Sequence, residues 1–170
     1  MSLTFLLGGA RSGKSSLAVE LALEADGPVT VIATAEPRDD EMRERILLHR
    51  RERPPEWQTV EEPVRLAEAI AELPTDAVLV LDCISLWVAN VIERGADDAE
   101  VERQNELAVD AALERSAKTI AVSNEVGLGV VPDTPLGRRY RDLLGRINAR
   151  WAVGADEALF VVAGRALELR

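Results

Sequence analysis

The sequence predicts an α/β fold: a mostly parallel sheet with helices on both faces and a closing antiparallel hairpin. Short apolar stretches alternate with stretches of helical periodicity along the chain, which is the order typical of parallel sheets. Residues 78–81 and 120–122 are almost continuously hydrophobic, as expected of strands that are buried on both faces. The chain has 170 residues, a length that suits one domain over residues 1–170.

The first half of the chain supplies strand and helix signals in turn. We expect strands at residues 3–7, 29–33, 58–60 and 77–81, and helices at about residues 14–25, 39–51 and 63–73. A run of glycines separates the first strand from the first helix. Met42 and Ile46 give the charged second helix an apolar side, and Pro63 suits the first turn of the third helix.

The second half continues this alternation. We expect helices at residues 85–92, 99–115 and 136–152, and strands at residues 118–123, 158–163 and 166–169. Gly95 separates the first two of these helices, and a turn around Gly164 and Arg165 makes the last two strands a hairpin. Residues 124–135 hold two Gly, two Pro and one Asn, which indicate a loop, and its length favours a functional role over a merely flexible connection.

The composition excludes several classes of protein. The formal net charge of −10 argues against nucleic acid or an anionic membrane as a partner, because clustered Lys and Arg bind both. The single cysteine, Cys83, cannot form an internal disulfide, and the single histidine, His49, excludes a zinc site with several histidines. No apolar run reaches the roughly 18–20 residues of a membrane span. Residues 3–7 lack the basic flank of a secretory signal. We therefore expect a cytoplasmic protein.

The strongest motif is a glycine-rich loop between the first strand and the first helix. It matches G-x-x-x-x-G-K-[ST] in full with Gly8, Gly9, Ala10, Arg11, Ser12, Gly13, Lys14 and Ser15. Glycines let backbone N–H groups turn inward around a phosphate. The Lys14 ammonium can reach the β- and γ-phosphates of a nucleotide, and the Ser15 hydroxyl can ligate Mg²⁺. An ordinary glycine-rich turn is the weaker interpretation, because the motif stands between a strand and a helix.

Other candidate residues lie at the end of a strand or of a charged helix. Asp82 ends an apolar strand, where P-loop proteins commonly hold Mg²⁺, and helix capping is the alternative. His49 lies at the end of a charged helix, where the pattern alone favours a solvated residue over a catalytic one. Arg50, Arg51 and Arg53 could bind phosphate or simply complement the negative helix end.

Several motifs occur in an order that is specific in combination. The loop at residues 8–15 is followed by His49 and by the run Asn124-Glu125-Val126-Gly127. Further matching segments are residues 32–35, 40–42, 45–46, 53–54, 57, 59–63, 81–90, 131–132, 141–142, 145–148 and 155–157. With these motifs, over residues 6–169, the chain resembles the bifunctional adenosylcobinamide kinase / adenosylcobinamide-phosphate guanylyltransferase family of cobalamin biosynthesis.

The resemblance implies two reactions at one nucleotide site. A nucleoside triphosphate, ATP or GTP, phosphorylates the aminopropanol hydroxyl of adenosylcobinamide. GTP then transfers GMP to that phosphate through a covalent guanylyl-histidine, which gives adenosylcobinamide-GDP and pyrophosphate. His49 is the matching position. Asp82 and Glu125 are both candidates for the general base of the kinase step. The resemblance also implies a RecA-like P-loop NTPase fold and a homotrimer.

The nucleotide contacts of the family map onto three segments of this chain and two single positions. They are Gly8, Gly9, Ala10, Arg11, Ser12, Gly13, Lys14, Ser15, Ala33, Thr34, Ala35, Arg50, Arg51, Glu52, Arg53, Glu61 and Asp82. Lys14, His49 and Asp82 are the expected catalytic residues, and Ser15 and Asp82 the expected Mg²⁺ ligands. Glu52 is the odd member, because a carboxylate cannot neutralise phosphate. We expect it to contact the nucleotide through its backbone or to accept a hydrogen bond from guanine or ribose.

The sequence departs from the family pattern at two positions, and two alternative functions stay open. Ala89 stands where many members of the family carry Thr, and Arg165 where an apolar residue is commoner, which leaves the exact corrinoid open. One alternative function is a P-loop kinase of another small alcohol without guanylyl transfer. The other is a non-catalytic, GTP-dependent regulatory module. Covalent modification of His49 discriminates both from the dual enzyme.

Overall fold

The computed structural model describes residues 2–170. One sheet contains seven strands in the order β3-β2-β4-β5-β1-β6-β7. The strands are β1 (Ser2–Gly8), β2 (Val29–Ala33), β3 (Gln58–Glu61), β4 (Val78–Asp82), β5 (Lys118–Asn124), β6 (Glu157–Val162) and β7 (Arg165–Glu168). Every neighbouring pair is parallel except β6 and β7. The predicted parallel sheet and closing hairpin are therefore confirmed.

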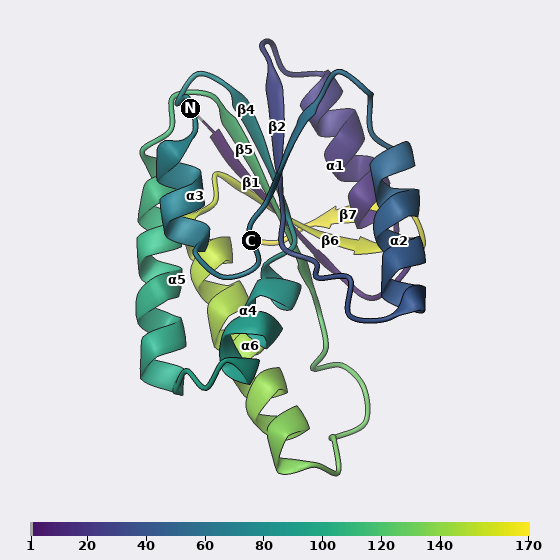
Figure 1. Ribbon diagram of the computed structural model, residues 1–170, viewed down its shortest axis with the longest axis vertical. Coiled ribbons are helices and arrows are strands. Elements are labelled where there is room, and N and C mark those ends of the chain that lie inside the picture. Colours follow the sequence, from purple (N-terminus) through teal and green to yellow (C-terminus); the bar gives the residue numbers. More distant parts are fainter. Residues whose placement is uncertain (1) are drawn as a thin grey trace.

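Helices cover both faces of this sheet, as the sequence predicts. They are α1 (Lys14–Leu23), α2 (Asp40–Arg51), α3 (Leu66–Glu72), α4 (Ile84–Glu93), α5 (Asp98–Leu113) and α6 (Pro135–Gly154). Figure 1 shows α3, α4, α5 and α6 on one side of the sheet and α1 and α2 on the other. Among the described residues, no helix is long and apolar enough to cross a membrane.

The core has two parts, one on each face of the sheet. The larger part packs the fully buried Trp87 of α4 and Trp151 of α6 against β1 and β4. The smaller part packs Ala18 and Ala22 of α1 against the other face. Each tryptophan N–H keeps a partner: Trp87 donates to the Val64 carbonyl and Trp151 to the Asn105 carboxamide. The central strands are thus buried on both faces, which explains their continuous apolar sequence.

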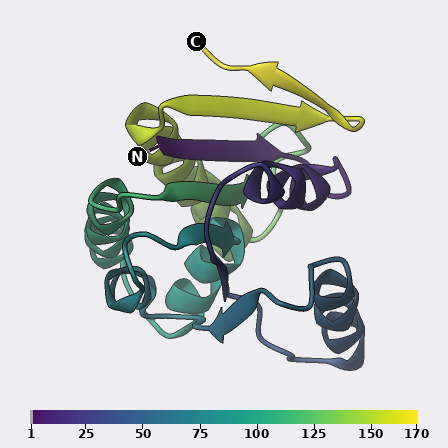
Figure 2. The ribbon, with the colours of Figure 1, turned by 90° about the horizontal axis from the view of Figure 1, so that it is seen from above.

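Helix α2 stands apart from this packing. None of its residues is fully buried, and Figure 2 shows it set away from the stack of strands. Its N-terminus is capped by Asp39, whose carboxylate accepts from the Met42 N–H at 2.7 Å. Acidic residues lie in its first turn and basic residues in its last turn, an arrangement that complements the helix dipole. Local interactions rather than core burial therefore stabilise the helix that carries His49.

Most predicted boundaries differ from the structure by one to three residues, and two of these differences have a clear physical reason. The third helix begins at Leu66, because the Glu62 carboxylate accepts from the backbone N–H groups of Val64 and Arg65 and forms a turn there. The final turn is made by Ala163 and Gly164, with φ of 51° and 70°, as in the two-residue turns favoured by hairpins. Arg165 is already the first residue of β7.

Candidate active site

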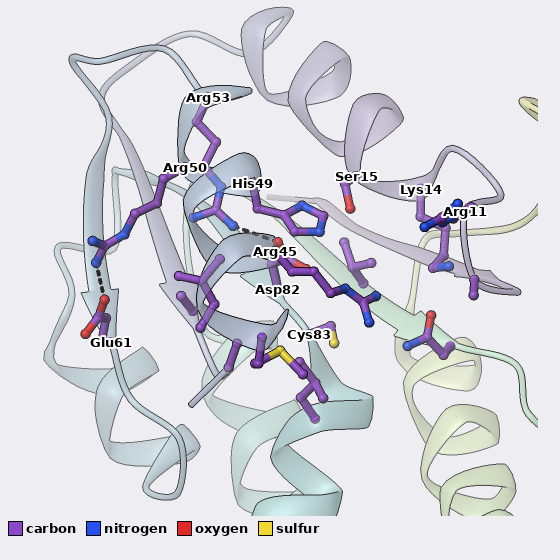
Figure 3. Close-up of a pocket in the computed structure, with 18 residues that line it drawn as sticks. Arg11, Lys14, Ser15, Arg45, His49, Arg50, Arg53, Glu61, Asp82 and Cys83 are labelled. Atoms are coloured by element: carbon purple, nitrogen blue, oxygen red, sulfur yellow. Dashed lines mark hydrogen bonds and ion pairs between the residues drawn. The ribbon is translucent and has the colours of Figure 1, made fainter. Parts of the chain in front are cut away.

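The carboxyl ends of β1, β2, β4 and β5 meet around a cavity of about 270 Å³. Figure 3 shows the side chains that line it, which come from the glycine-rich loop, these strand ends and one face of α2. The predicted site residues in the lining are Ala10, Arg11, Lys14, Ser15, Ala33, Ala35, His49, Arg50, Arg53, Glu61 and Asp82. The fold thus brings the P-loop and His49 to one cavity.

The P-loop is fixed by its lysine and its glycines. The Lys14 ammonium is buried and donates to the Gly8 and Gly9 carbonyls at 2.8 and 2.6 Å. Burial lowers the pKa of Lys14, and the nearby Asp82 carboxylate acts in the opposite direction. A Cβ at Gly8 would lie 2.2 Å from the Val161 carbonyl oxygen, so only glycine lets β6 lie beside the loop. Gly13 has a φ of +105°, which L side chains rarely adopt.

Thr34 lies under the cavity rather than in its lining. It is fully buried, and its hydroxyl donates to the Cys83 carbonyl at 2.7 Å and accepts from the Cys83 N–H at 2.9 Å. The Asn90 carboxamide donates to the Thr34 carbonyl. Thr34 therefore ties the end of β2 to the start of α4. Gly8, Gly9, Ser12 and Gly13 likewise form the frame of the loop rather than the cavity lining.

Asp82 ends β4 inside the cavity and is paired with an arginine. The Arg53 guanidinium donates to Asp82 Oδ2 at 2.6 Å, and only 10% and 19% of the two side chains are exposed. The Arg50 guanidinium pairs in the same way with Glu61 of β3. Both ion pairs join the end of α2 to strand ends of the sheet.

The donor set suits a magnesium ion that also binds phosphate. Ser15 and Asp82 offer one hydroxyl and one carboxylate to the same cavity. Among the described residues, no group of three or more His, Cys, Asp or Glu side chains could hold a metal alone. Mg²⁺ prefers oxygen ligands and is commonly bound through one or two protein groups together with substrate phosphates. The residues present fit that mode.

His49 stands between two cavities. Its side chain is 42% exposed, and Figure 3 shows it extending from α2 toward the P-loop. His49 also lines a second cavity of about 320 Å³, which contains Glu52 and Trp57. The imidazole Nδ1 lies 3.7 Å from the Glu52 carboxylate. Glu52 therefore lines only the second cavity, which shares Ser15 and Asp82 with the first, while Arg51 lines neither.

The structure adds residues that the sequence analysis did not assign to the site. They are Met42, Arg45, Ile46, Cys83, Leu86, Val122 and Asn124. The first three share one helical face with His49, because positions three, four and seven residues apart lie on the same side of a helix. That spacing is a signal by which they could have been found. The others come from strand ends and α4, which only the assembled sheet places together.

Two polar groups beside the cavity are held by their neighbours. Burial raises the pKa of the Cys83 thiol to about 11, so it stays neutral. The Asn124 carboxamide donates to the Ser85 hydroxyl at 2.8 Å. Glu125 follows Asn124 but lies outside the lining, and its carboxylate accepts from the Gly127 N–H. Of the two candidate bases, only Asp82 therefore faces the cavity.

Comparisons with known proteins agree over almost the whole chain. A family model described as cobinamide kinase / cobinamide phosphate guanyltransferase matches residues 4–169. The bifunctional adenosylcobalamin biosynthesis protein CobP of Pseudomonas aeruginosa is 41% identical over 167 residues, which cover 97% of this chain and 95% of that protein. The corresponding CobU protein of Escherichia coli is 36% identical over 176 residues, with coverages of 96% and 97%.

Solved structures show the same fold at low identity. An ATPase from a type III secretion system of pathogenic bacteria superposes with a TM-score of 0.56 at 14% identity, over 94% of this chain and 51% of that chain. The RadB recombinase gives a TM-score of 0.54 at 17% identity, over 94% and 73%. These likenesses show the fold alone, and they confirm the predicted RecA-like P-loop architecture.

Proposed function

The chain belongs to the cobinamide kinase / cobinamide phosphate guanyltransferase family, and from that premise we propose how its residues perform the two reactions. It is a bifunctional enzyme of cobalamin biosynthesis that uses nucleoside triphosphates. One observation carries the proposal: a single cavity contains Lys14 and Ser15 of the P-loop together with His49 and Asp82. Its substrates are adenosylcobinamide and adenosylcobinamide phosphate.

In the kinase step, the P-loop presents the γ-phosphate of ATP or GTP to the aminopropanol hydroxyl. Lys14 exchanges its bonds to the Gly8 and Gly9 carbonyls for the β- and γ-phosphates. Arg11 and Arg45 also line this cavity and counter the charge that develops on the transferred phosphoryl group. Asp82 is the better placed of the two candidate bases, because Glu125 lies outside the lining.

In the guanylyl transfer, the same loop holds the β- and γ-phosphates of GTP, and His49 attacks the α-phosphorus. An imidazole nitrogen forms a P–N bond while the bond from the α-phosphorus to the pyrophosphate oxygen breaks. The phosphate of adenosylcobinamide phosphate then attacks the same phosphorus, and the P–N electron pair returns to the imidazole. Ala33, Ala35, Arg50 and Glu61 also line the cavity, and Figure 3 shows Arg50 and Glu61 away from the P-loop, where we propose that the guanosine of GTP binds.

We propose that Ser15 and Asp82 hold Mg²⁺ together with phosphate oxygens. The ion supplies charge neutralisation for the leaving pyrophosphate when it is bound. Asp82 reaches that role by giving up its bond to Arg53, so Arg53 becomes free to contact phosphate. We also propose a homotrimer and a cytoplasmic location. Light scattering of the purified protein tests the first, and cell fractionation the second.

Covalent labelling tests the proposal. The purified protein is incubated with Mg²⁺ and GTP labelled at the α-phosphate, beside His49→Ala and the control Glu44→Ala. Glu44 lies on the same helix, is exposed and lines neither cavity. We expect acid-labile label on the wild type and on Glu44→Ala, and none on His49→Ala. Wild-type protein that binds GTP without taking label would instead indicate a plain P-loop kinase or a nucleotide-dependent switch.

A further inference from the structure

We propose that the P-loop also binds the acceptor: the phosphate of adenosylcobinamide phosphate enters the place that pyrophosphate has left. The inference rests on the proposed function, because it concerns the second half of guanylyl transfer. In this proposal a single anion site binds pyrophosphate first and the acceptor phosphate afterwards. The acceptor phosphate therefore has no separate subsite. Two independent features of the structure lead to it: the geometry of attack at His49 and the charges of the two cavities.

The geometry follows from the position of His49 opposite the P-loop. Phosphoryl and nucleotidyl groups are transferred with the attacking and leaving atoms roughly in line. When His49 attacks the α-phosphorus, pyrophosphate therefore departs on the side away from the imidazole, where Arg11 and Lys14 line the first cavity only. In the second displacement, His49 is the leaving group. The acceptor oxygen must then enter on the side away from His49, which is again the P-loop side.

The charges on the P-loop side favour a phosphate. The cavity is lined by the cations Arg11, Lys14, Arg45, Arg50 and Arg53 and by the anions Glu61 and Asp82. Arg50 and Arg53 are paired with those two carboxylates. Within residues 2–170, Arg11 and Arg45 form no ion pair, and Lys14 bonds only neutral oxygens. Three positive charges thus remain for the phosphates in this cavity.

The charges in the second cavity oppose a phosphate. The second cavity contains the carboxylates of Glu20, Glu52 and Asp82 and one cation, Arg53, which is already paired with Asp82. A phosphate dianion placed there would meet two uncompensated carboxylates. Ser15, His49, Arg53 and Asp82 line both cavities, whereas Arg11 and Lys14 line only the first. Geometry and charge therefore select the same cavity.

One shared anion site makes pyrophosphate and the acceptor mutually exclusive. The guanylylated enzyme binds either pyrophosphate, which regenerates GTP, or adenosylcobinamide phosphate, which takes the GMP. The unmodified enzyme binds either GTP or adenosylcobinamide phosphate, so an excess of the acceptor blocks guanylylation. The product of the kinase step must consequently leave the P-loop before GTP can modify His49. A two-site enzyme would show neither form of exclusion.

Initial-rate kinetics of the wild-type enzyme test this inference. We expect parallel lines for GTP and adenosylcobinamide phosphate at low concentrations, and inhibition by excess acceptor that is competitive with GTP. At saturating GTP, pyrophosphate is expected to be competitive with adenosylcobinamide phosphate; with GTP its inhibition is expected to be of mixed type, because pyrophosphate binds the P-loop of both the guanylylated and the unmodified enzyme. The reverse pattern, with pyrophosphate competitive only with GTP, would overturn the shared site while leaving the guanylyl-histidine intact. Absence of covalent label would instead refute the proposed function.

Equilibrium binding provides a second readout without turnover. His49→Ala cannot be guanylylated, and binding of adenosylcobinamide phosphate to it can be followed by dialysis through the corrinoid absorbance. Pyrophosphate at ten times its own Kd is expected to raise the apparent Kd of the acceptor about tenfold. At higher pyrophosphate concentrations this apparent Kd should keep rising without reaching a plateau. A plateau would reveal a ternary complex and refute the shared site. His49→Asn serves as a second variant if His49→Ala does not fold.

Discussion

The Arg53 guanidinium donates to the Asp82 carboxylate over 2.6 Å, and this ion pair joins the end of the His49 helix to the end of β4. Helix α2 has no fully buried residue, so such contacts are important for its position. The pair therefore couples the proposed nucleophile to the proposed magnesium ligand. When phosphate and metal compete for these two side chains, the end of α2 is released from β4.

Replacement of Arg53 tests this coupling. Arg53→Ala leaves a largely buried carboxylate without its partner, which is expected to cost about 1–3 kcal/mol of unfolding free energy. We expect guanylylation of His49 to slow at least about tenfold, because the variant loses the proposed phosphate contact of Arg53 and because a shift of the catalytic group by about 1 Å has effects of that order or larger. Arg53→Lys keeps the positive charge but lacks the planar guanidinium, so it should recover part of the lost stability and part of the lost guanylylation rate. Urea unfolding and single-turnover labelling measure the two effects.

The matched control, Arg43, lies on α2, whose last residue precedes Arg53 by two positions. Arg43 pairs with Asp40 at 2.8 Å, but 60% and 99% of these side chains are exposed. Arg43→Ala is therefore expected to change the unfolding free energy by less than about 0.5 kcal/mol and to leave labelling unchanged. An Arg53→Ala protein that behaves like this control would show that the ion pair does not position α2.

Much of the fold could be predicted from the sequence because its signals are local. Apolar strands, helical periodicity and the P-loop motif each occupy a few consecutive residues. The strand order could not be predicted in this way, because it depends on contacts between residues far apart in the chain. β1, for example, lies between β5 and β6, with Phe5 opposite both Ala121 and Ala158.

The site was predictable in part for the same reason. The P-loop and Asp82 follow from local motifs, while His49 was singled out by a family resemblance rather than by its surroundings. The pairing of Arg53 with Asp82 spans 29 positions, and no local pattern indicates it. Thr34 was expected at the nucleotide, yet its side chain lies beneath the cavity and bonds the Cys83 backbone. A residue type and a position in the chain do not reveal which way a side chain points.

Thr34 provides a second prediction, about stability. Thr34→Val keeps the shape of the side chain but leaves the buried Cys83 N–H and carbonyl without their partner. We expect a loss of about 2–5 kcal/mol in unfolding free energy. Thr34→Ser keeps the hydroxyl and loses one methyl group, which should cost about 1 kcal/mol and leave GTP affinity close to that of the wild type. Equal losses in both variants, measured by urea unfolding, would contradict the assigned hydrogen bonds.

Cys83 provides a third prediction, about pH. Burial, together with the neighbouring Asp82 charge, raises the pKa of its thiol from 9.0 to about 11, against the smaller opposing effect of Lys14. Below pH 9 both folded and unfolded chains hold a neutral thiol, so the full stability is present. Between pH 9 and 11 the unfolded chain ionises first, and stability falls by up to about 3 kcal/mol.

Comparison with Cys83→Ala isolates this effect. Burial, the main cause of the raised pKa of Tyr140, is present in both proteins, and only the smaller contribution of the Cys83 charge is lost in the variant. We expect the difference in unfolding free energy between wild type and variant to shrink as the pH rises from 8 to 11. A difference that stays constant over this range would show that the thiol of the folded protein titrates normally.

Glu52 provides the last prediction, about which nitrogen of His49 reacts. Its carboxylate lies 3.7 Å from Nδ1 and lines only the second cavity, so it attracts the Nδ1 proton. The Nε2 lone pair is then the nucleophile, and the guanylyl group is expected on Nε2.

Glu52→Gln should slow labelling by about tenfold to a hundredfold without changing GTP affinity. Mass spectrometry and ³¹P spectra of the labelled peptide distinguish the two isomers. A guanylyl group on Nδ1 would require the imidazole to turn over before it attacks, and would remove the orienting role from Glu52.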